Sequence, residues 1–426
     1  MAKKSKAGNR KTAKTRTTKP RTGGGKTAVS AAKKPAAKSG RKSADKSGSN
    51  NKATTTKKAA AASNNKPTAK RSSSPTQLLG QIKKLDRDLA KIMNQRAALA
   101  TKYAVSNGDG NETTVAADLA QIADSLDLGK GPLPKQTVSS VFRELVSGCH
   151  SLAKATRVSY LGPEYSYCHL AALERFGSSA ELVPVGAISA VFEEVHRGHA
   201  KYGIVPLENS TDGRIADTLD MFTRLPVRIA GEVQMRIHHC LLGKCSRGEV
   251  MEVYSRPQAL SQCRNWLVRH LPGARTVELT STSAAAQMAA HKQGAAAIAS
   301  RQAGLHHGLE ILAERIEDNG SNITRFAVIS DESSPRTGRD KTAIMFQTEH
   351  AVGALADALA IFKRNRLNLT WIESFPVPEE PGAYLFFVEL EGHESDVKVR
   401  RTVASLERKT VTLEVLGSYA KTEVVE

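Results

Sequence analysis

The sequence lacks several features by which whole classes of protein are recognised. Its five cysteines (Cys149, Cys168, Cys240, Cys245 and Cys263) form no CxxC pair and no metal-ligand spacing with histidine. The sequence contains no run of about eighteen or more apolar residues, which a membrane-spanning helix would need, and the N-terminus lacks the apolar core of a secretion signal. We therefore expect reduced thiols, no metal or other cofactor, no membrane span and a cytoplasmic location.

Acidic residues are almost absent from residues 1–75, which hold 17 Lys and 5 Arg against one acid, Asp45. The whole chain carries +20, so residues 76–426 carry −1 and the basic balance belongs to the tail. Few large apolar side chains occur there, so burial cannot offset the entropy of ordering, and we expect disorder. Two interpretations stay open: salt-sensitive contact with nucleic acid or another polyanion, and a solubilising extension.

Residues 76–155 are predicted to be mainly helical. An apolar stripe with Lys, Arg and Asp between its members predicts an amphipathic helix over residues 76–104. A polar break follows, then a shorter helix over Val115–Leu128 and a third over Val138–Ala155. Helices of this length indicate a helical bundle.

Residues 156–335 alternate short apolar runs with helical patterns, which predicts an α/β body with mainly parallel sheets. In one such unit the apolar run Tyr202–Leu207 ends in the polar turn 208–213, and a helical spacing follows. The helix N-terminus would suit a carboxylate or phosphate, although an ordinary capped turn is the alternative. Several polar loops of this kind suggest two lobes around a cleft.

Five motifs in this body resemble those of prephenate dehydratases. In chain order they are Tyr160-Leu-Gly-Pro-Glu164 with His169-Leu-Ala-Ala172, Val205-Pro-Leu-Glu-Asn-Ser210, Tyr254-Ser-Arg-Pro-Gln-Ala-Leu260 with Gln262-Cys263, Ser281-Thr282, and Asn322-Ile-Thr-Arg-Phe326. Five motifs in order are far more specific than any one of them. The resemblance implies a two-lobed body like type II periplasmic binding proteins, with prephenate bound in the cleft.

The resemblance also implies roles for individual residues. Thr324 would donate or relay a proton to the hydroxyl that leaves as prephenate loses CO2, with Glu208 or a water in support. Arg325 and helix N-termini would hold the pyruvyl carboxylate, and neutral groups would face the ring carboxylate, because that group must shed its charge. The implied catalytic residues are Thr324, Glu208 and Asn209, and the implied substrate-binding residues are Ser210, Ser255, Gln262, Arg325, Ser281 and Thr282.

Some of these residues have ordinary structural alternatives. Ser255, Ser281 and Thr282 would serve equally well as helix N-caps, and Asn322 as a turn-shaping residue. Arg256 stands where the family commonly has His, so that His cannot be essential in this chain.

Residues 340–421 are predicted to follow the order βαββαβ, which is ferredoxin-like. Gly353-Ala354-Leu355 and Asn368-Leu369-Thr-Trp-Ile-Glu373-Ser374 resemble the ACT domain, which binds phenylalanine between paired domains. By that resemblance, the loop at Gly353 would take the carboxylate of phenylalanine and Glu373 its ammonium. Phe375 replaces the family's Arg, which leaves the strength of feedback open, and a purely structural dimerisation domain is the alternative. The implied effector residues are Gly353, Ala354, Leu355, Asn368, Leu369, Glu373 and Ser374.

The helical segment resembles the chorismate mutase domain that is fused to bacterial prephenate dehydratases. It contains Leu85-Asp86-x-x-Leu89 with Arg96, and Gly131-Pro-Leu-Pro134 with Phe142-Arg-Glu-Leu145. Leu79, however, occupies the position of the family's first Arg. Fixed positive charge stabilises the dianionic transition state of that reaction, so we expect a mutase-like fold with weak or absent mutase activity.

Together these patterns predict a cytoplasmic prephenate dehydratase of phenylalanine biosynthesis, regulated by L-phenylalanine. It would form a homodimer or homotetramer through its helical and ACT domains. The expected boundaries are a basic tail at 1–75, a helical domain at 76–155, a catalytic body at 156–335 and an ACT domain at 340–421. Three alternatives stay open: an arogenate dehydratase, a bifunctional enzyme with residual mutase activity, and a non-catalytic sensor of aromatic acids.

Overall fold

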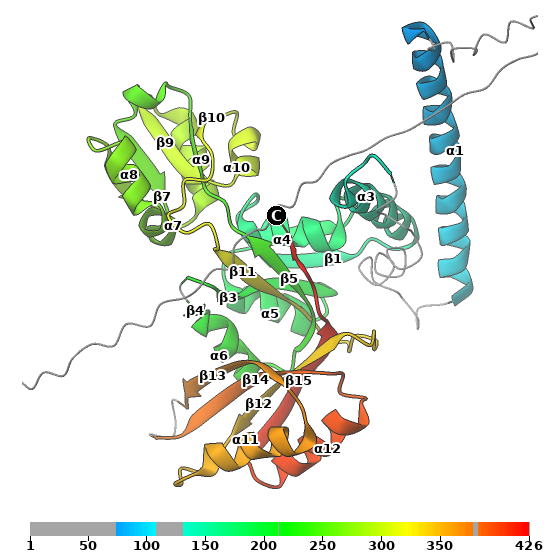
Figure 1. Ribbon diagram of the computed structural model, residues 1–426, viewed down its shortest axis with the longest axis vertical. Coiled ribbons are helices and arrows are strands. Elements are labelled where there is room, and N and C mark those ends of the chain that lie inside the picture. Colours follow the sequence, from blue (N-terminus) through cyan, green and yellow to red (C-terminus); the bar gives the residue numbers. More distant parts are fainter. Residues whose placement is uncertain (1–73, 108–130, 212, 378–381, 426) are drawn as a thin grey trace, which may run out of the picture. The chain divides into compact units, whose positions relative to one another are not determined.

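The computed structural model describes residues 74–107, 131–211, 213–377 and 382–425 (Figure 1). The predicted tail and the predicted helix over Val115–Leu128 lie outside these residues. Within them, no helix is long and apolar enough to cross a membrane. All five cysteines are unpaired.

Within the described residues, α1 (Pro75–Asn107) and α3 (Lys135–Ala153) precede the α/β body, at the places of the first and third predicted helices. Ser74 caps α1, because its hydroxyl accepts from the Gln77 N–H and the Gln77 side chain accepts from the Ser74 N–H. Arg96 on α1 donates from Nη1 to Cys149 Sγ on α3 at 3.1 Å. The apolar stripe of α1 stays exposed, with Leu85 66% accessible.

The first sheet has the strand order β16-β5-β11-β3-β1-β2, and β4 pairs with β3. Its strands are β1 (Arg157–Leu161), β2 (Glu181–Val185), β3 (Tyr202–Asn209), β4 (Gly213–Arg214), β5 (Arg228–Arg236), β11 (Ile323–Ser330) and β16 (Val424–Val425). The helices of this part are α4 (Tyr167–Phe176), α5 (Ile188–His196) and α6 (Ala216–Arg224). Strands β1, β2 and β3 are parallel as predicted, but β11 runs antiparallel to both β3 and β5. The sheet is therefore mixed.

The second sheet has the order β10-β6-β9-β7-β8. Its strands are β6 (Cys240–Gly243), β7 (Glu252–Ser255), β8 (Arg275–Glu278), β9 (Ala295–Ala299) and β10 (Glu310–Ala313). Its helices are α7 (Pro257–Gln262), α8 (Arg264–His270), α9 (Thr282–His291) and α10 (Arg301–His306), with a short 3-10 helix at Arg247–Glu249. The chain enters this sheet after β5 and returns to the first sheet before β11. These two crossover segments are hydrogen-bonded to each other. The Ile237 N–H donates to the Asn322 carbonyl at 2.8 Å, and the Ile316 N–H donates to the His239 carbonyl at 3.0 Å.

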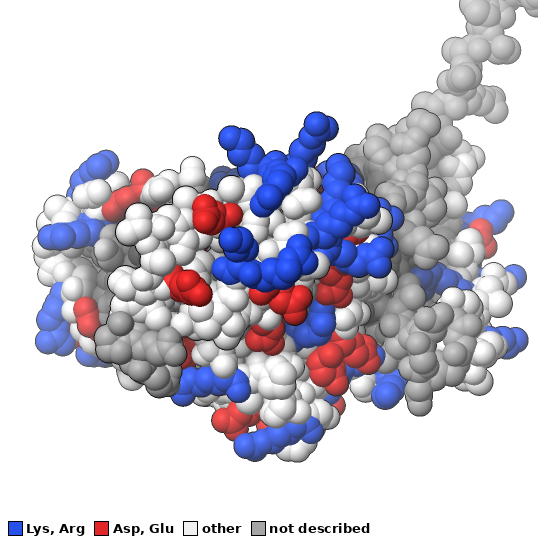
Figure 2. Space-filling view, turned by 90° about the horizontal axis from the view of Figure 1, so that it is seen from below, with Lys and Arg blue, Asp and Glu red and all other residues white. Residues whose placement is uncertain are grey.

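The third sheet has the antiparallel order β13-β14-β12-β15. Its elements are β12 (Asp340–Gln347), α11 (Ala354–Asn365), β13 (Leu369–Pro376), β14 (Tyr384–Glu391), α12 (Val397–Glu407) and β15 (Thr412–Ala420). This is the βαββαβ order that the sequence predicts. Seen from the side of α11 and α12, the surface carries side chains of both charge signs, as the near-neutral balance of residues 76–426 predicts (Figure 2).

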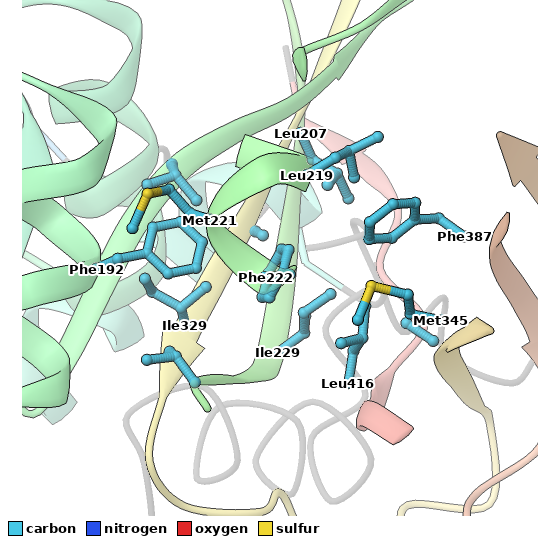
Figure 3. Packing of buried hydrophobic residues seen from close by; sticks show 14 of the residues in the cluster. Phe192, Leu207, Leu219, Met221, Phe222, Ile229, Ile329, Met345, Phe387 and Leu416 are labelled. Atoms are coloured by element: carbon cyan, nitrogen blue, oxygen red, sulfur yellow. The ribbon is translucent and has the colours of Figure 1, made fainter. Parts of the chain in front are cut away.

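The first and third sheets share one apolar core. Phe387, Met345 and Leu416 from the third sheet lie beside Phe222 of α6 and Ile229 of β5 (Figure 3). At Gly417, β15 lies so near β5 that a Cβ atom would stand 2.2 Å from the Ile229 carbonyl oxygen. Only glycine permits this approach, so the third sheet packs tightly on the strands that carry the site.

Candidate active site

A cavity of about 730 Å³ is lined by residues of both the first and the second sheet. Asn209 at the end of β3 and Thr324 near the start of β11 contribute from the first sheet, and Asn322 from the returning crossover. Gln262, Ser281 and Thr282 contribute from the helices of the second sheet. Residues more than a hundred positions apart therefore meet at one cleft, as the motif resemblance implies.

Thr324 and Asn209 are direct neighbours across the β3–β11 ladder. The Asn209 amide donates from Nδ2 to Thr324 Oγ1 at 2.8 Å and to Asn322 Oδ1 at 2.9 Å. All three side chains are buried, with at most 9% of any residue accessible. Buried polar groups of this kind are ordered by the hydrogen bonds that they must make.

The direction of these hydrogen bonds follows from one backbone group. The Thr211 N–H can only donate, and it bonds to Asn209 Oδ1 at 2.9 Å, which fixes the Asn209 amide with its NH2 toward Thr324. Thr324 Oγ1 therefore accepts this bond, and the threonine keeps its own O–H to donate into the cavity. A threonine held in this way is suited to give a proton to a bound substrate.

The donor and acceptor roles of the next hydrogen bonds, toward the second sheet, follow in the same way. Because Asn322 Oδ1 accepts from Asn209, its Nδ2 donates to Gln262 Oε1 at 3.1 Å. Gln262 Oε1 also lies 2.9 Å from His239 Nε2, which must then carry the hydrogen. Burial lowers the pKa of His239, although its bond to Gln262 partly opposes that shift, and the lowered pKa favours the neutral ring. Nδ1 of this ring faces the Tyr167 hydroxyl at 3.1 Å.

Glu208 and Arg325 point away from this network, which corrects the roles expected for them. Consecutive residues of a strand face opposite sides of a sheet, so the neighbours of Asn209 and Thr324 lie on the other face. There Arg325 donates to Glu208 at 2.9 Å, to Glu232 at 3.0 Å and to Glu389 at 2.5 Å. Burial alone would lower the pKa of Arg325, but the neighbouring carboxylates raise it above its usual value. A guanidinium engaged in this way is not placed to hold a ligand in the cleft.

The remaining predicted substrate-binding residues divide between the cleft and the framework. Ser281 caps α9 by accepting from the Ala284 N–H at 3.0 Å, and it lines the cavity together with Thr282. Ser255 is fully buried and donates to the Ile298 carbonyl at 2.7 Å, which makes it a framework residue. Ser210 donates to the Ser321 carbonyl at 3.2 Å and accepts from the Ile323 N–H at 2.9 Å, joining the end of β3 to β11.

The residues of the cleft that were not assigned a site role from the sequence include Asn322, His239 and Arg256. Asn322, for which a turn-shaping role was the alternative, is the central member of the amide network. The neighbour of His239, His238, instead pairs with Glu317 at 2.7 Å. Arg256 is the one Lys or Arg among the described residues that line the cavity. Arg256 lies inside the Tyr254–Leu260 motif, directly before helix α7, and membership of that motif was the signal that could have identified it. Gln258 and Gln262 of α7 line the same cleft.

The predicted effector residues all belong to the third sheet and its first helix. Gly353 takes a left-handed backbone conformation, with φ of 83°, directly before Ala354 and Leu355 at the start of α11. Asn368, Leu369, Glu373 and Ser374 lie on or beside β13. Glu373 forms an ion pair with Arg214 of β4 at 3.1 Å. Among the described residues, no group of three or more His, Cys, Asp or Glu side chains could hold a metal ion.

Comparison with known proteins gives concordant matches. Residues 158–334 match the family described as Prephenate dehydratase. The chain is 38% identical to the bifunctional chorismate mutase/prephenate dehydratase of Aquifex aeolicus, over 81% of this chain and 97% of that protein. It is 40% identical to the bifunctional enzyme of Stutzerimonas stutzeri, over 70% of this chain and 82% of that protein. Among solved structures, the prephenate dehydratase of Arthrobacter aurescens in complex with L-Phe has a TM-score of 0.59 at 31% identity, over 62% of this chain and 90% of that one.

Proposed function

The chain belongs to the prephenate dehydratase family, and on that premise we propose that Thr324 and Asn209 form the catalytic centre of a prephenate dehydratase. The reaction removes the ring hydroxyl and one carboxyl group of prephenate and leaves phenylpyruvate. The observation that carries the proposal is the hydrogen bond from Asn209 to Thr324, because it leaves the O–H of this cavity-lining threonine available to donate to a bound substrate.

The proposed mechanism is a single elimination. The bond from the ring carbon to its carboxyl group breaks, CO2 departs, and the released electron pair completes the aromatic ring as the C–O bond breaks. The hydroxyl leaves as water with the Thr324 proton, and the threonine regains a proton from solvent. The Asn209 amide stabilises the negative charge that develops on Oγ1 during the transfer.

Substrate binding would rely on Arg256 rather than Arg325. Arg256 brings positive charge to the cavity, and Ser281 and Thr282 bring hydroxyl groups at the start of α9. This set suits the retained pyruvyl carboxylate. The ring carboxylate would face the neutral amides of Asn322 and Gln262, since a strong ion pair there would resist decarboxylation.

Replacing Thr324 tests the proposal. We expect Thr324→Ala to lower kcat for prephenate by about 10²–10⁴-fold with little change in KM, because the proton donor is lost while substrate contacts remain. Thr324→Ser should retain much of the activity, and Thr276→Ala on the exposed β8 strand should match the parent. Full turnover by Thr324→Ala would remove Thr324 from the mechanism.

Two alternatives concern the substrate. Arogenate carries an ammonium group where prephenate has its keto oxygen, and Asp217 at the cavity wall could receive that group. Steady-state kinetics with both substrates distinguishes them, and we expect the larger kcat/KM with prephenate because Arg256 would repel an ammonium group. A protein that bound aromatic acids and converted neither substrate would be a sensor.

We further propose that residues 340–421 are an ACT domain that binds L-phenylalanine at Gly353–Leu355 and Asn368–Ser374. The order of the third sheet supports this, as does the L-Phe complex of the Arthrobacter relative. Isothermal titration of the protein with phenylalanine would test it. Absence of binding at millimolar phenylalanine would leave the third sheet as a structural unit.

The helical segment is proposed to be a mutase-like domain with weak or absent activity. The relatives from Aquifex aeolicus and Stutzerimonas stutzeri are bifunctional, but Leu79 of this chain supplies no charge, and Arg96 donates to Cys149. An assay of chorismate consumption would decide, and rapid turnover would contradict the proposal.

We also propose a cytoplasmic location, which the unpaired cysteines favour, and a polyanion-binding role for the basic tail.

A further inference from the structure

The reverse face of the catalytic strands carries a buried group of charged residues that the mechanism does not use. We call it the back-face cluster; its members are Glu208, Glu232, Arg325, Lys341, Glu389 and Tyr419. Lys341 donates to Glu232 at 2.8 Å, and the Tyr419 hydroxyl donates to Glu389 at 2.6 Å. Glu232 and Glu389 are each 1% accessible, so the cluster is closed to solvent at its centre.

Stability gives a poor explanation for such a cluster. Charges are costly to bury, and apolar side chains of similar size often stabilise a core better. What a buried cluster of mutually bonded charges does provide is one fixed geometry. Arg325 shows this, because three carboxylates hold its guanidinium and its centre lies 5.7 Å from the Trp371 ring.

The cluster is directly behind the catalytic pair. Arg325 follows Thr324 on β11, and Glu208 precedes Asn209 on β3. In the ladder, Thr324 is paired with Asn209 and Arg325 with Glu208. On each strand, two adjacent residues therefore connect the two faces of the sheet through their backbone. A rotation of either strand that moves the Arg325–Glu208 ion pair would also move the hydrogen bond between Asn209 and Thr324.

Every strand of the third sheet contributes to this contact. Lys341 of β12 is paired with Tyr419 of β15, and Trp371 of β13 is paired with Glu389 of β14. Lys341 contacts Glu232, and Glu389 and Trp371 contact Arg325, while Tyr419 bonds to Glu389. The third sheet is thus joined by charge and by packing to the strands that position Thr324.

A second ion pair joins the proposed effector site to the same strands. Glu373, the proposed partner of the phenylalanine ammonium, binds Arg214 at 3.1 Å. Arg214 lies opposite Glu208 in the β3–β4 pair, and Gly213 lies opposite Asn209. An ammonium group bound at Glu373 would compete with Arg214 for the carboxylate and so release one of the contacts that hold β4.

We propose that Arg325 and Glu208 are positioning residues through which the third sheet sets the orientation of Thr324 and Asn209. Effector binding then changes kcat by way of the Glu373–Arg214 pair and the back-face cluster. The second part of this inference rests on the proposed function, in which phenylalanine binds at Glu373.

The test compares two glutamates of strand β14 in the full-length protein. Glu389→Gln keeps the shape of the side chain but removes its charge, and we expect kcat to fall about tenfold or more while KM changes less than about twofold. The response of kcat to phenylalanine should weaken as well. The control is Glu391→Gln, whose carboxylate is about half exposed and pairs with Lys421, and it should match the parent.

Milder variants keep the test decisive if Glu389→Gln does not fold. Tyr419→Phe removes one hydrogen bond to Glu389, and Arg214→Gln removes the pair with Glu373. Each should reduce the change in kcat at saturating phenylalanine by about threefold or more, because the coupling between the two sites is weakened.

Three results would overturn the inference: a raised KM at unchanged kcat in Arg325→Lys, parent-like kinetics in Glu389→Gln, or an unaltered phenylalanine response in both milder variants. Failure of the proposed function has a different signature. It would show as full activity of Thr324→Ala, or as no binding of phenylalanine to the unmodified protein.

Discussion

At the scale of single residues, Asn209 determines which way the cleft hydrogen bonds run. Its amide oxygen is held by the Thr211 N–H, so its NH2 group must face Thr324 and Asn322. The sequence motif supplies the asparagine, but its direction comes from a backbone group two residues along the chain.

Asn209→Asp should reverse the bond to Thr324. A carboxylate can still accept from Thr211 but cannot donate, so the threonine hydroxyl would donate to it instead of to the substrate. We expect kcat for prephenate to fall by about 10²-fold. The matched control is Asn319→Asp, because this exposed side chain only accepts from the Ser321 N–H and should tolerate the change. An Asn209→Asp protein with parent-like kcat would contradict the assigned direction.

His239 makes a second residue-scale prediction, about stability and pH. Burial lowers its pKa in the folded protein, so below pH of about 6.5 the unfolded chain binds more protons than the folded one. Its contribution to stability is therefore complete above that pH and is lost as the pH falls toward the folded-state value. The loss is at most about 1.4 kcal/mol per pH unit for one site.

Urea unfolding at several pH values between 5.5 and 7.5 checks this, with His239→Gln as the comparison. Glutamine preserves a donor toward Gln262 and does not titrate, so the stability of this variant should depend less on pH than that of the parent. Equal slopes for the two proteins would show that His239 does not carry the effect.

At the scale of elements, strand β11 has two functions on its two faces. Thr324 faces the cleft and Arg325 faces the third sheet, and β3 repeats this division with Asn209 and Glu208. Alternation along a strand makes this possible, since adjacent side chains separate to opposite sides.

The close approach of β15 to β5 predicts that Gly417→Ala destabilises the fold. Gly417 has φ of 148°, and an added methyl group would overlap the Ile229 carbonyl, forcing the strands apart. We expect a loss of about 1–3 kcal/mol in the free energy of unfolding. Gly248→Ala has open space around its Cβ position and is the control. Equal urea midpoints for these two variants would be inconsistent with the packing described.

At the scale of the whole molecule, the apolar stripe on α1 is exposed, and a contact between copies of the chain through it can be tested. Ile82, Leu85 and Leu89 are each more than half exposed. Contiguous apolar surface of this kind commonly marks a protein contact. The homodimer or homotetramer expected from the sequence would cover it.

Leu85→Glu should therefore shift the protein toward smaller species in sedimentation velocity, because a charge would be buried at the interface. We expect the dissociation constant to rise about tenfold or more. Leu305→Glu on α10 changes a leucine of similar exposure outside this stripe and should leave the assembly unchanged. Identical sedimentation of both variants and the parent would argue against α1 as the interface.

The sequence by itself determined much of this protein, because local patterns carry much of the information. The apolar spacing gave α1, the element order gave the βαββαβ unit, and the motifs selected Thr324, Asn209 and Gln262 as members of one cleft. Each of these depends on residues close together in the chain, or on a string of motifs whose order is specific.

Only the tertiary structure decided which face each motif residue uses. The motif Asn322–Phe326 contains Thr324 and Arg325 side by side, and no pattern within it says which one meets the substrate. That choice depends on β11 lying antiparallel between β3 and β5, with the cleft on one side and the third sheet on the other. The same arrangement turned Arg325 and Glu208 away from the cleft and brought in His239 and Arg256, because contacts between distant segments exist only after the chain has folded.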